Sequence, residues 1–351
     1  MNETSTPTVP QQGGRLRYID LYRGVAILAV VGIHVMGALP SKLTVGSLKW
    51  QVIAGTGILL QFAVPAFLLL TAFLLTRSGL KSFDRAKYIR TRVVQTLPPY
   101  LIWNIFYTCL VPTKRNDFWF VVGRVLIGKG YFHLYFLFLI VQLYILIPLC
   151  LPIWRKRPPF WQAAIGTVSL TLAIYLTNRF VFHGVPLIGS VIFWYTPAIS
   201  LGMWLGSQER RIQEVLDKGY PSAIALAVLG GTLFLTLSLR DMRHLPVNTF
   251  YYQVGAWVYA TSMAFLLLWG SERLSENADF QLLLYLGTNS MQIYLLHPLI
   301  LLWLKGAYQG TTLFTLVVAF ASYSLCAILL PIGFAWVVTR LRLAPLLFGR
   351  G

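Results

Sequence analysis

Runs of about 20 apolar residues recur along the whole chain, and they limit the possible folds more than any other feature. Each run is long enough to cross a hydrocarbon core of about 30 Å as one α-helix. Of the 351 residues, 57% are hydrophobic and only 11% are charged. The strands of an outer-membrane barrel would instead alternate in polarity over ~10 residues, and these runs do not. The sequence therefore predicts an all-α polytopic membrane protein.

The apolar runs predict about ten transmembrane helices within a single transmembrane domain at residues 15–345, with no appended soluble domain. Residues 1–14 are polar and are expected to be a disordered tail. Residues 118–127 are apolar but too short to cross, which indicates a segment that lies in the membrane interface or folds back. The ten spans are roughly 21–39, 51–76, 93–111, 132–153, 160–178, 190–206, 220–239, 250–270, 282–303 and 312–339.

The basic residues predict the orientation of these helices. The net charge of +18 is concentrated in short loops between apolar runs, so it does not indicate a nucleic-acid partner. With the N-terminus in the cytoplasm, 18 of the 29 Lys and Arg residues fall in cytoplasmic segments and 10 in outer segments. This bias predicts that both termini are cytoplasmic.

The positions of the acidic residues and of the cysteines bear on two functions, ion-coupled transport and metal binding. Of the 11 acidic residues only Asp20 touches a predicted span, which disfavours a proton- or cation-coupled transporter but not an uncoupled exporter. The cysteines Cys109, Cys150 and Cys326 have no CxxC spacing, so we expect buried small hydrophobes and no metal site.

Arg23 and His34 share the first span, with ten residues between them. Eleven positions at ~100° each bring both side chains to one face of a helix, ~16 Å apart along its axis. Ionisable groups are expensive in a bilayer, so this pair indicates a functional role. The alternative is a snorkelling arginine at the helix end and a hydrogen-bonded core histidine.

Two more histidines are expected near the depth of His34. His297 lies about as deep in a span of the same direction, and His133 opens a span at the outer face. Histidine titrates near neutral pH and serves as a general acid or base. The alternative for His297 is a ring that simply bonds a backbone carbonyl.

Arg23, Arg90 and Arg92 are predicted to form a row at the inner level, where guanidinium forks bind phosphates. A donor with phosphates at one end and an acyl thioester at the end of a long arm, as in acyl-coenzyme A, fits this row below His34. The alternative for Arg90 and Arg92 is an ordinary basic loop on the cytoplasmic side.

Five motifs follow one another over about residues 15–340, and their order is more specific than any one of them. They are Asp20-Leu21-Tyr22-Arg23-Gly24 with His34; Val64-Pro65-Ala66-Phe67; Arg90-Thr91-Arg92 before Pro98-Pro99-Tyr100; Tyr131-Phe132-His133-Leu134; and Ile293-Tyr294-Leu295-Leu296-His297-Pro298. The ordered set resembles the integral-membrane acyltransferase-3 family. The sequence departs from the family pattern at Ala72, where glycine is usual, and at Gln95, where a second arginine is often found.

This resemblance implies a multi-pass O-acyltransferase of the bacterial inner membrane. It would move an acyl group, most simply acetyl, from cytoplasmic acyl-CoA to a hydroxyl of a cell-envelope glycan or lipid-linked saccharide. It implies no bound cofactor or metal, membrane lipid as surroundings, and glycan-synthesis machinery as a possible partner. The implied residues are His34 as general base or transient acyl carrier, Arg23 in donor binding, Asp20, Arg90 and Arg92 in support, and His133, His297 and Tyr294 on the acceptor side.

Two other functions stay open. One is an exporter of exopolysaccharide, as proposed for the poly-N-acetylglucosamine branch of the same family, which would need no catalysis. The other is a structural scaffold in an envelope complex, which would tolerate substitution of both His34 and Arg23.

Overall fold

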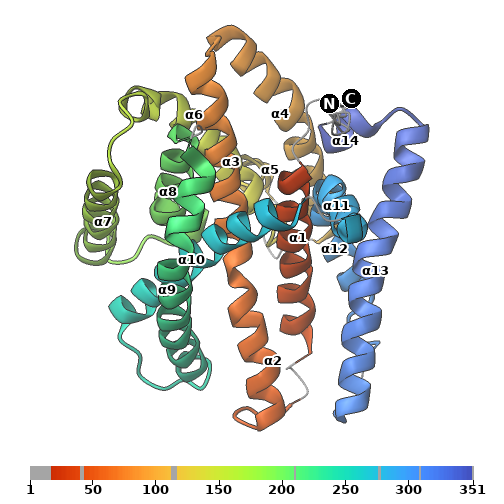
Figure 1. The fold of residues 1–351 in the computed structure, drawn as a ribbon. Coiled ribbons are helices and arrows are strands. Elements are labelled where there is room, and N and C mark those ends of the chain that lie inside the picture. Colours follow the sequence, from red (N-terminus) through yellow and green to blue (C-terminus); the bar gives the residue numbers. More distant parts are fainter. Residues whose placement is uncertain are drawn as a thin grey trace, which may run out of the picture.

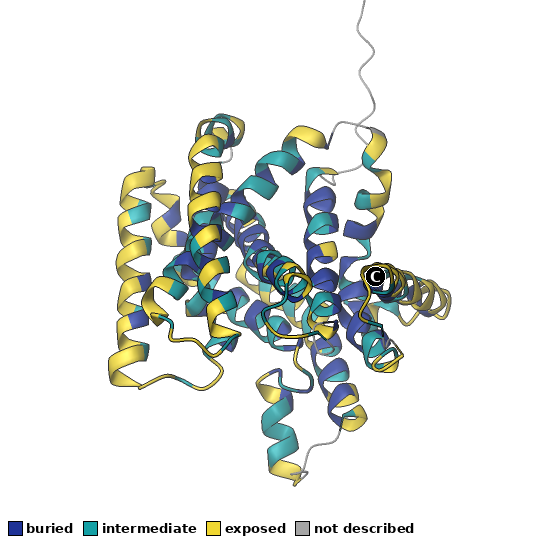
Figure 2. Cartoon of the chain, turned by 90° about the horizontal axis from the view of Figure 1, so that it is seen from below, coloured by how far each residue is buried: buried dark blue, intermediate teal, exposed yellow. Residues whose placement is uncertain are grey.

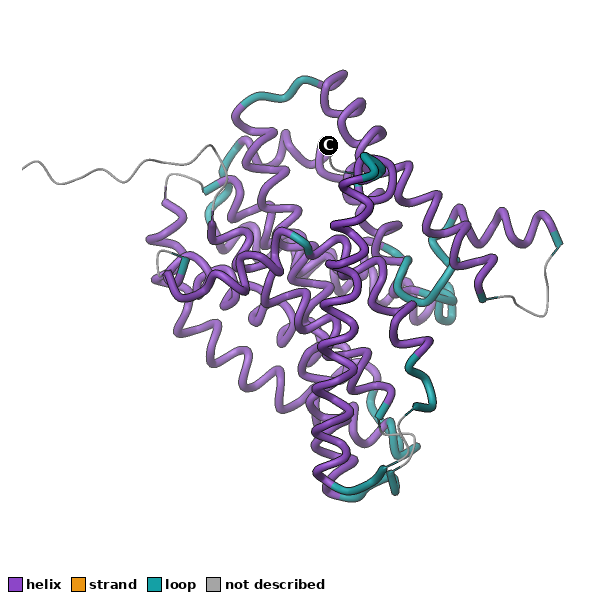
Figure 3. The backbone as a smooth tube through the Cα atoms, turned by 90° about the vertical axis from the view of Figure 1, so that its right-hand side faces the viewer, coloured by secondary structure: helices purple, strands orange, loops and turns teal. Residues whose placement is uncertain are grey.

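The computed structural model of the chain is a bundle of α-helices, shown in Figure 1. The structure describes residues 17–39, 43–111, 117–208, 211–275, 278–307 and 310–349. Within these ranges every regular element is a helix, and the tube in Figure 3 shows no strand. The predicted all-α class is therefore confirmed, whereas the tail expected at residues 1–14 lies outside the described residues.

Seven helical segments of the described chain are long and apolar enough to cross a membrane. Two of them contain a local change of helix type, because α2 (Leu48–Leu59) continues through η2 (Leu60–Phe62) into α3 (Ala63–Lys81), and α7 (Phe160–Leu176) ends in η3 (Thr177–Val181). The seven are α1 (Arg17–Ala38), Leu48–Lys81, α6 (Tyr135–Arg155), Phe160–Val181, α9 (Ile212–Asp241), α10 (Thr249–Leu274) and α13 (Leu313–Arg340).

The other three predicted spans are also helical. α4 (Arg85–Leu110) carries basic residues in its first turns, α8 (Thr196–Ser207) has 12 residues, and α11 (Gln281–Thr288) is followed by α12 (Ser290–Trp303). Length or composition alone does not qualify these three as spans, so the count of ten stays a prediction. Short elements complete the fold: α5 (Phe118–Leu126), η4 (Ile188–Ser190), η5 (Ile192–Tyr195), η7 (Ala278–Phe280) and α14 (Ala344–Phe348).

The outer surface of the bundle is apolar, as expected for helices that face lipid. Figure 2 shows buried residues in the central helices and exposed residues on the outer faces. Large side chains such as Leu149 on α6, Leu229 on α9 and Phe314 on α13 are 71%, 68% and 76% exposed. A soluble monomer rarely exposes so much apolar surface, so the structure supports a multi-pass membrane protein.

The cysteines correct one expectation from the sequence. Cys109 is exposed, and Cys150 and Cys326 are half-buried, so the prediction of buried cysteines is wrong. All three have free thiols. A small apolar side chain is as compatible with lipid as with a protein core, so composition could not decide which of the two it would face.

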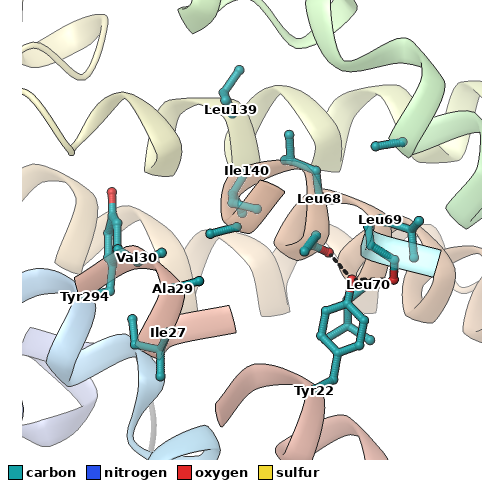
Figure 4. Packing of buried hydrophobic residues seen from close by; sticks show 14 of the residues in the cluster. Tyr22, Ile27, Ala29, Val30, Leu68, Leu69, Leu70, Leu139, Ile140 and Tyr294 are labelled. Carbon is teal, nitrogen blue, oxygen red and sulfur yellow. Dashed lines mark hydrogen bonds between the residues drawn. The ribbon is translucent and has the colours of Figure 1, made fainter. Parts of the chain in front are cut away.

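α1 lies at the centre of the bundle, where it contacts α2, α3, α10, α11 and α12. Tyr22 is fully buried, and its hydroxyl lies 3.0 Å from the backbone oxygen of Ala66 and 3.2 Å from that of Ala264 (Figure 4). These contacts join α1 to α3 and α10. They fix the rotation of α1 and hence the direction in which Arg23 and His34 project.

α1 also crosses α11 with the two backbones in contact. A Cβ atom at Gly24 would overlap the backbone oxygen of Leu283, and one at Gly287 would overlap that of Asp20. Small residues allow membrane helices to approach this closely. The crossing therefore sets the height of Asp20 and Arg23 against α11.

The start of α1 and the helix α14 lie at the same end of the molecule, at the top of Figure 1. The indole Nε1 of Trp103 on α4 donates to the backbone oxygen of Leu347 at 2.8 Å, which holds α14 against α4. Both ends of the described chain thus share one side of the bundle. That this side is cytoplasmic stays a prediction.

Candidate functional site

One face of α1 carries the predicted Arg23–His34 pair. Both side chains are half-buried, and Val30 lies between them on the same face. Val30, Ile33 and His34 line a cavity, whereas Arg23 is not among its lining residues. Ile27, one turn beyond Arg23, is 1% exposed. The cavity therefore includes the histidine of the pair but not the arginine.

His34, His133 and His297 come from three separate elements and meet at one place. The ring centroids of His34 on α1 and His297 on α12 are 5.2 Å apart, and the rings are stacked with 25° between their planes. The ring of His133, from the turn before α6, lies 5.9 Å from that of His297 at 69°. The hydroxyl of Tyr294 donates to the backbone oxygen of His133 and so ties this turn to α12. The structure thus brings all three predicted histidines together.

The ring nitrogens of the two deeper histidines are incompletely bonded. His297 is fully buried, and its Nδ1 lies 3.0 Å from the backbone oxygen of Ile293. Since a carbonyl only accepts, Nδ1 carries the proton and Nε2 keeps a lone pair. That Nε2, together with both ring nitrogens of His133, has no hydrogen-bond partner within the described residues. Unpaired buried polar atoms are costly, which favours a functional role over simple packing.

His34 is the most accessible of the three. Its ring packs against two others, that of Phe132 at 4.8 Å between centroids and that of His297. His133 also lines the cavity but is only 2% exposed. A group that must reach a substrate needs exposed ring atoms, and His34 meets this need best.

The cavity beside His34 has a volume of about 380 Å³, at the lower end of the range for small-molecule sites. Its walls come from α1, α3, α6, α9, α10 and α12 and from the segments η2, η4 and η5. Ten of its 21 lining residues are aromatic: Phe67, Tyr135, Phe136, Trp194, Tyr195, Phe234, Tyr252, Trp257, Tyr259 and Tyr294.

Two arginines of the predicted row, Arg90 and Arg92, lie in different environments. Arg92 on α4 is half-buried, with its Cζ 5.3 Å from the ring centroid of Tyr88 and 5.0 Å from that of Tyr144. Arg90 is exposed, because two positions turn a helix by ~200° and send the two side chains in different directions. Of the two, Arg92 is the one directed against α6.

Asp20 was predicted to hold Arg23. Its side chain is buried, with 6% of the residue exposed, at the point where α1 crosses α11. Tyr18, two residues earlier in α1, accepts a hydrogen bond from Nη1 of Arg77 at 3.1 Å. The N-terminal end of α1 therefore gathers two arginines and one carboxylate, an arrangement suited to an anionic group.

The cavity residues that were not predicted from the sequence include Gln61, Gln253, Trp194 and Trp257. The two glutamines carried a usable signal, since each is a polar residue inside a predicted span. The tryptophans carried none, because aromatic residues are common at membrane interfaces for other reasons.

Comparison with known proteins agrees with the motifs. The chain is 27% identical over 281 residues to a protein of Staphylococcus aureus strains MSSA476 and MW2 named "Probable poly-beta-1,6-N-acetyl-D-glucosamine export protein". The match covers 74% of this chain and 77% of that protein, and the protein of the same name from strain MRSA252 is 27% identical over 282 residues. The model of the acyltransferase-3 family, described as an acyltransferase domain, matches residues 16–340. The chain therefore belongs to the acyltransferase-3 family.

Proposed function

We propose that this protein is an inner-membrane O-acyltransferase. It transfers an acyl group, most simply acetyl, from cytoplasmic acyl-CoA to a hydroxyl of a cell-envelope or exported saccharide. The observation that carries the proposal is the accessible ring of His34 at the wall of a cavity rich in aromatic side chains, with His297 stacked against it. Membership in the acyltransferase-3 family supports the reaction class.

In the proposed reaction, a ring nitrogen of His34 accepts the proton of the acceptor hydroxyl. The hydroxyl oxygen forms a bond to the thioester carbonyl carbon, and the carbon–sulfur bond breaks. The leaving thiolate then takes the proton from the imidazolium, so that free thiol and ester are the products. His297 and His133 hold the ring of His34 in place, and Arg23 with Arg92 binds the phosphates of the donor.

A covalent route is the variant of this reaction in which the acyl group first bonds to His34. The acceptor hydroxyl would then attack the acyl-imidazole. Both routes need an unprotonated nitrogen on His34 at the start, so they make the same prediction for its substitution.

The decisive experiment uses the full-length protein in lipid nanodiscs with radiolabelled acetyl-CoA and a saccharide acceptor. A general base contributes about 10²- to 10⁴-fold, so His34→Gln is expected to slow transfer by that factor. His244→Gln is the matched control, because His244 is exposed and lies in the loop before α10. Transfer by His34→Gln at the wild-type rate would remove His34 from the chemistry.

A second function is favoured by the name of the relatives, which describes export of poly-β-1,6-N-acetylglucosamine. An exporter would move glycan across the membrane whether or not His34 can accept a proton. Cells that carry His34→Gln separate the two functions. Lost glycan acylation with unchanged export supports the enzyme, whereas unchanged acylation supports the exporter.

A further inference from the structure

Two glutamine side chains face the cavity from within membrane-spanning segments. Gln61 belongs to η2, the 3₁₀ turn near the middle of the span Leu48–Lys81, and Gln253 lies one turn into α10. Neither side-chain amide has a hydrogen-bond partner among the described residues. Gln61 is exposed and Gln253 is half-buried, and both line the cavity. Both amides are therefore available to a polar ligand in the cavity.

A rigid aromatic wall stands beside these amides. The rings of Trp194 and Trp257 are 5.2 Å apart between centroids at 61°, and Nε1 of Trp257 donates to the backbone oxygen of Trp194 at 2.8 Å. Tyr175 also packs against both tryptophans. Flat apolar surfaces held in place, with a few amides near them, suit a sugar ring, whose C–H face is apolar and whose edge carries hydroxyls.

The lining of the cavity carries no fixed charge. None of the described residues that line it is Asp, Glu, Lys or Arg. Lys129 lies close by, with its Nζ 5.8 Å from the ring centroid of Tyr135, but it donates to Oγ of Ser190 at 2.7 Å. Burial also lowers the pKa of the Lys129 ammonium. A charged ligand group would therefore lose its water without gaining an ionic partner in the lining.

We propose that Gln61, Gln253, Trp194 and Trp257 form the acceptor subsite, and that this subsite takes an uncharged hexopyranose ring. The tryptophans cover the apolar face of the ring, and the glutamine amides bond its hydroxyls or an N-acyl group. The assignment as an acceptor subsite rests on the proposed function, since it directs a hydroxyl of the bound sugar toward His34. Free amino sugars and uronates are excluded because they carry a charge.

The test measures binding rather than turnover. The full-length protein in detergent micelles, without acyl donor, is titrated by calorimetry with three trisaccharides: N-acetylglucosamine, glucosamine and a uronate-containing trisaccharide. The N-acetylglucosamine trisaccharide is expected to bind more than tenfold more tightly than either charged one. Equal or tighter binding of a charged trisaccharide, or no binding of the neutral one, would overturn the proposal.

Substitutions then locate the subsite. Gln61→Leu and Gln253→Leu are each expected to weaken binding of the neutral trisaccharide by about 3- to 10-fold, the loss of one hydrogen bond. The matched control is Gln162→Leu on the exposed face of α7, which should bind like the wild type. Unchanged affinity in both cavity variants would place the acceptor elsewhere.

The binding test and the transfer assay fail independently. If acyl transfer occurs but the cavity variants bind normally, the enzyme stands and the subsite is wrong. If transfer never occurs but neutral sugar binds and the cavity variants weaken it, the subsite stands and the transfer reaction is wrong.

Discussion

At the scale of single residues, the three clustered histidines differ in what their surroundings leave available. His297 uses Nδ1 on its own helix, and His133 is closed in by Tyr107, Tyr294 and His297. His34 combines ring contacts with exposure to the cavity. This difference is the reason to assign the proton transfer to His34 and a positioning role to the other two.

Arg23 is expected to bind the donor through the shape of its guanidinium group as well as its charge. Arg23→Lys keeps the charge but loses the planar fork that bonds phosphate oxygens in pairs. We expect kcat/KM for acetyl-CoA to fall about tenfold or more in this variant. Kinetics at varied donor concentration measure this, and wild-type kinetics in Arg23→Ala would exclude Arg23 from donor binding.

Arg92 and Arg90 provide a comparison on one helix. Arg92 is directed against α6 between two tyrosine rings, whereas Arg90 is exposed. Arg92→Lys is therefore expected to raise KM for the donor several-fold with little change in kcat, the sign of lost binding. Arg90→Lys should change KM less. A larger effect at Arg90 would mean that the phosphates bind on the outer face of α4.

At the scale of elements, the crossing of α1 and α11 positions the N-terminal end of α1, which carries Asp20 and Arg23. Gly287→Ala would place a Cβ atom against the backbone oxygen of Asp20, which cannot move without shifting α1. Overpacking of this kind costs about 1–3 kcal/mol or more. We expect a lower melting temperature in detergent and reduced acyl transfer.

Gly37→Ala is the control for this substitution on α1 itself. A Cβ atom at Gly37 would meet no other atom within 4 Å. Alanine is also the better helix former, so this variant should be as stable as the wild type or slightly more stable. Equal melting temperatures for Gly287→Ala and the wild type would show that the crossing can widen freely.

The break at η2 is a second feature that belongs to this scale. A 3₁₀ turn inside a long helix often marks a functional position. Here it lies beside the cavity and carries Gln61 into its lining. If α2 and α3 formed one unbroken α-helix, the residues before η2 would be rotated about the helix axis relative to those of α3. The part of the cavity wall formed by η2 and α3 would then change.

At the scale of the whole molecule, the apolar exterior and the basic loops predict one topology. Reporter fusions after Arg77, Arg157 and Arg340 should read as cytoplasmic, and those near Asn116 and Arg240 as outside. The basic residues near the first group are retained on the cytoplasmic side, so the result tests the count of ten spans as well as the orientation. An outside reading at Arg157 would contradict the ten-span arrangement.

Sequence patterns predicted the elements of the fold closely. Every predicted span corresponds to a helical segment, and the short apolar stretch at residues 118–127 forms the separate helix α5. The one-face relation of Arg23 and His34 also followed from helix geometry alone. These features depend on local periodicity and hydrophobic length, which a sequence states directly.

The sequence did not determine the features that depend on which helix faces meet. Gln61 and Gln253 are far apart in the chain but line the same cavity. Whether a cysteine is buried or exposed likewise depends on the helices that pack beside it. Hydrophobic length specifies that a helix crosses the membrane but not its rotation, since lipid and protein core are equally apolar. Close glycine contacts and the hydroxyl of Tyr22 fix that rotation, and through it the tertiary structure alone decides which side chains share the cavity with His34.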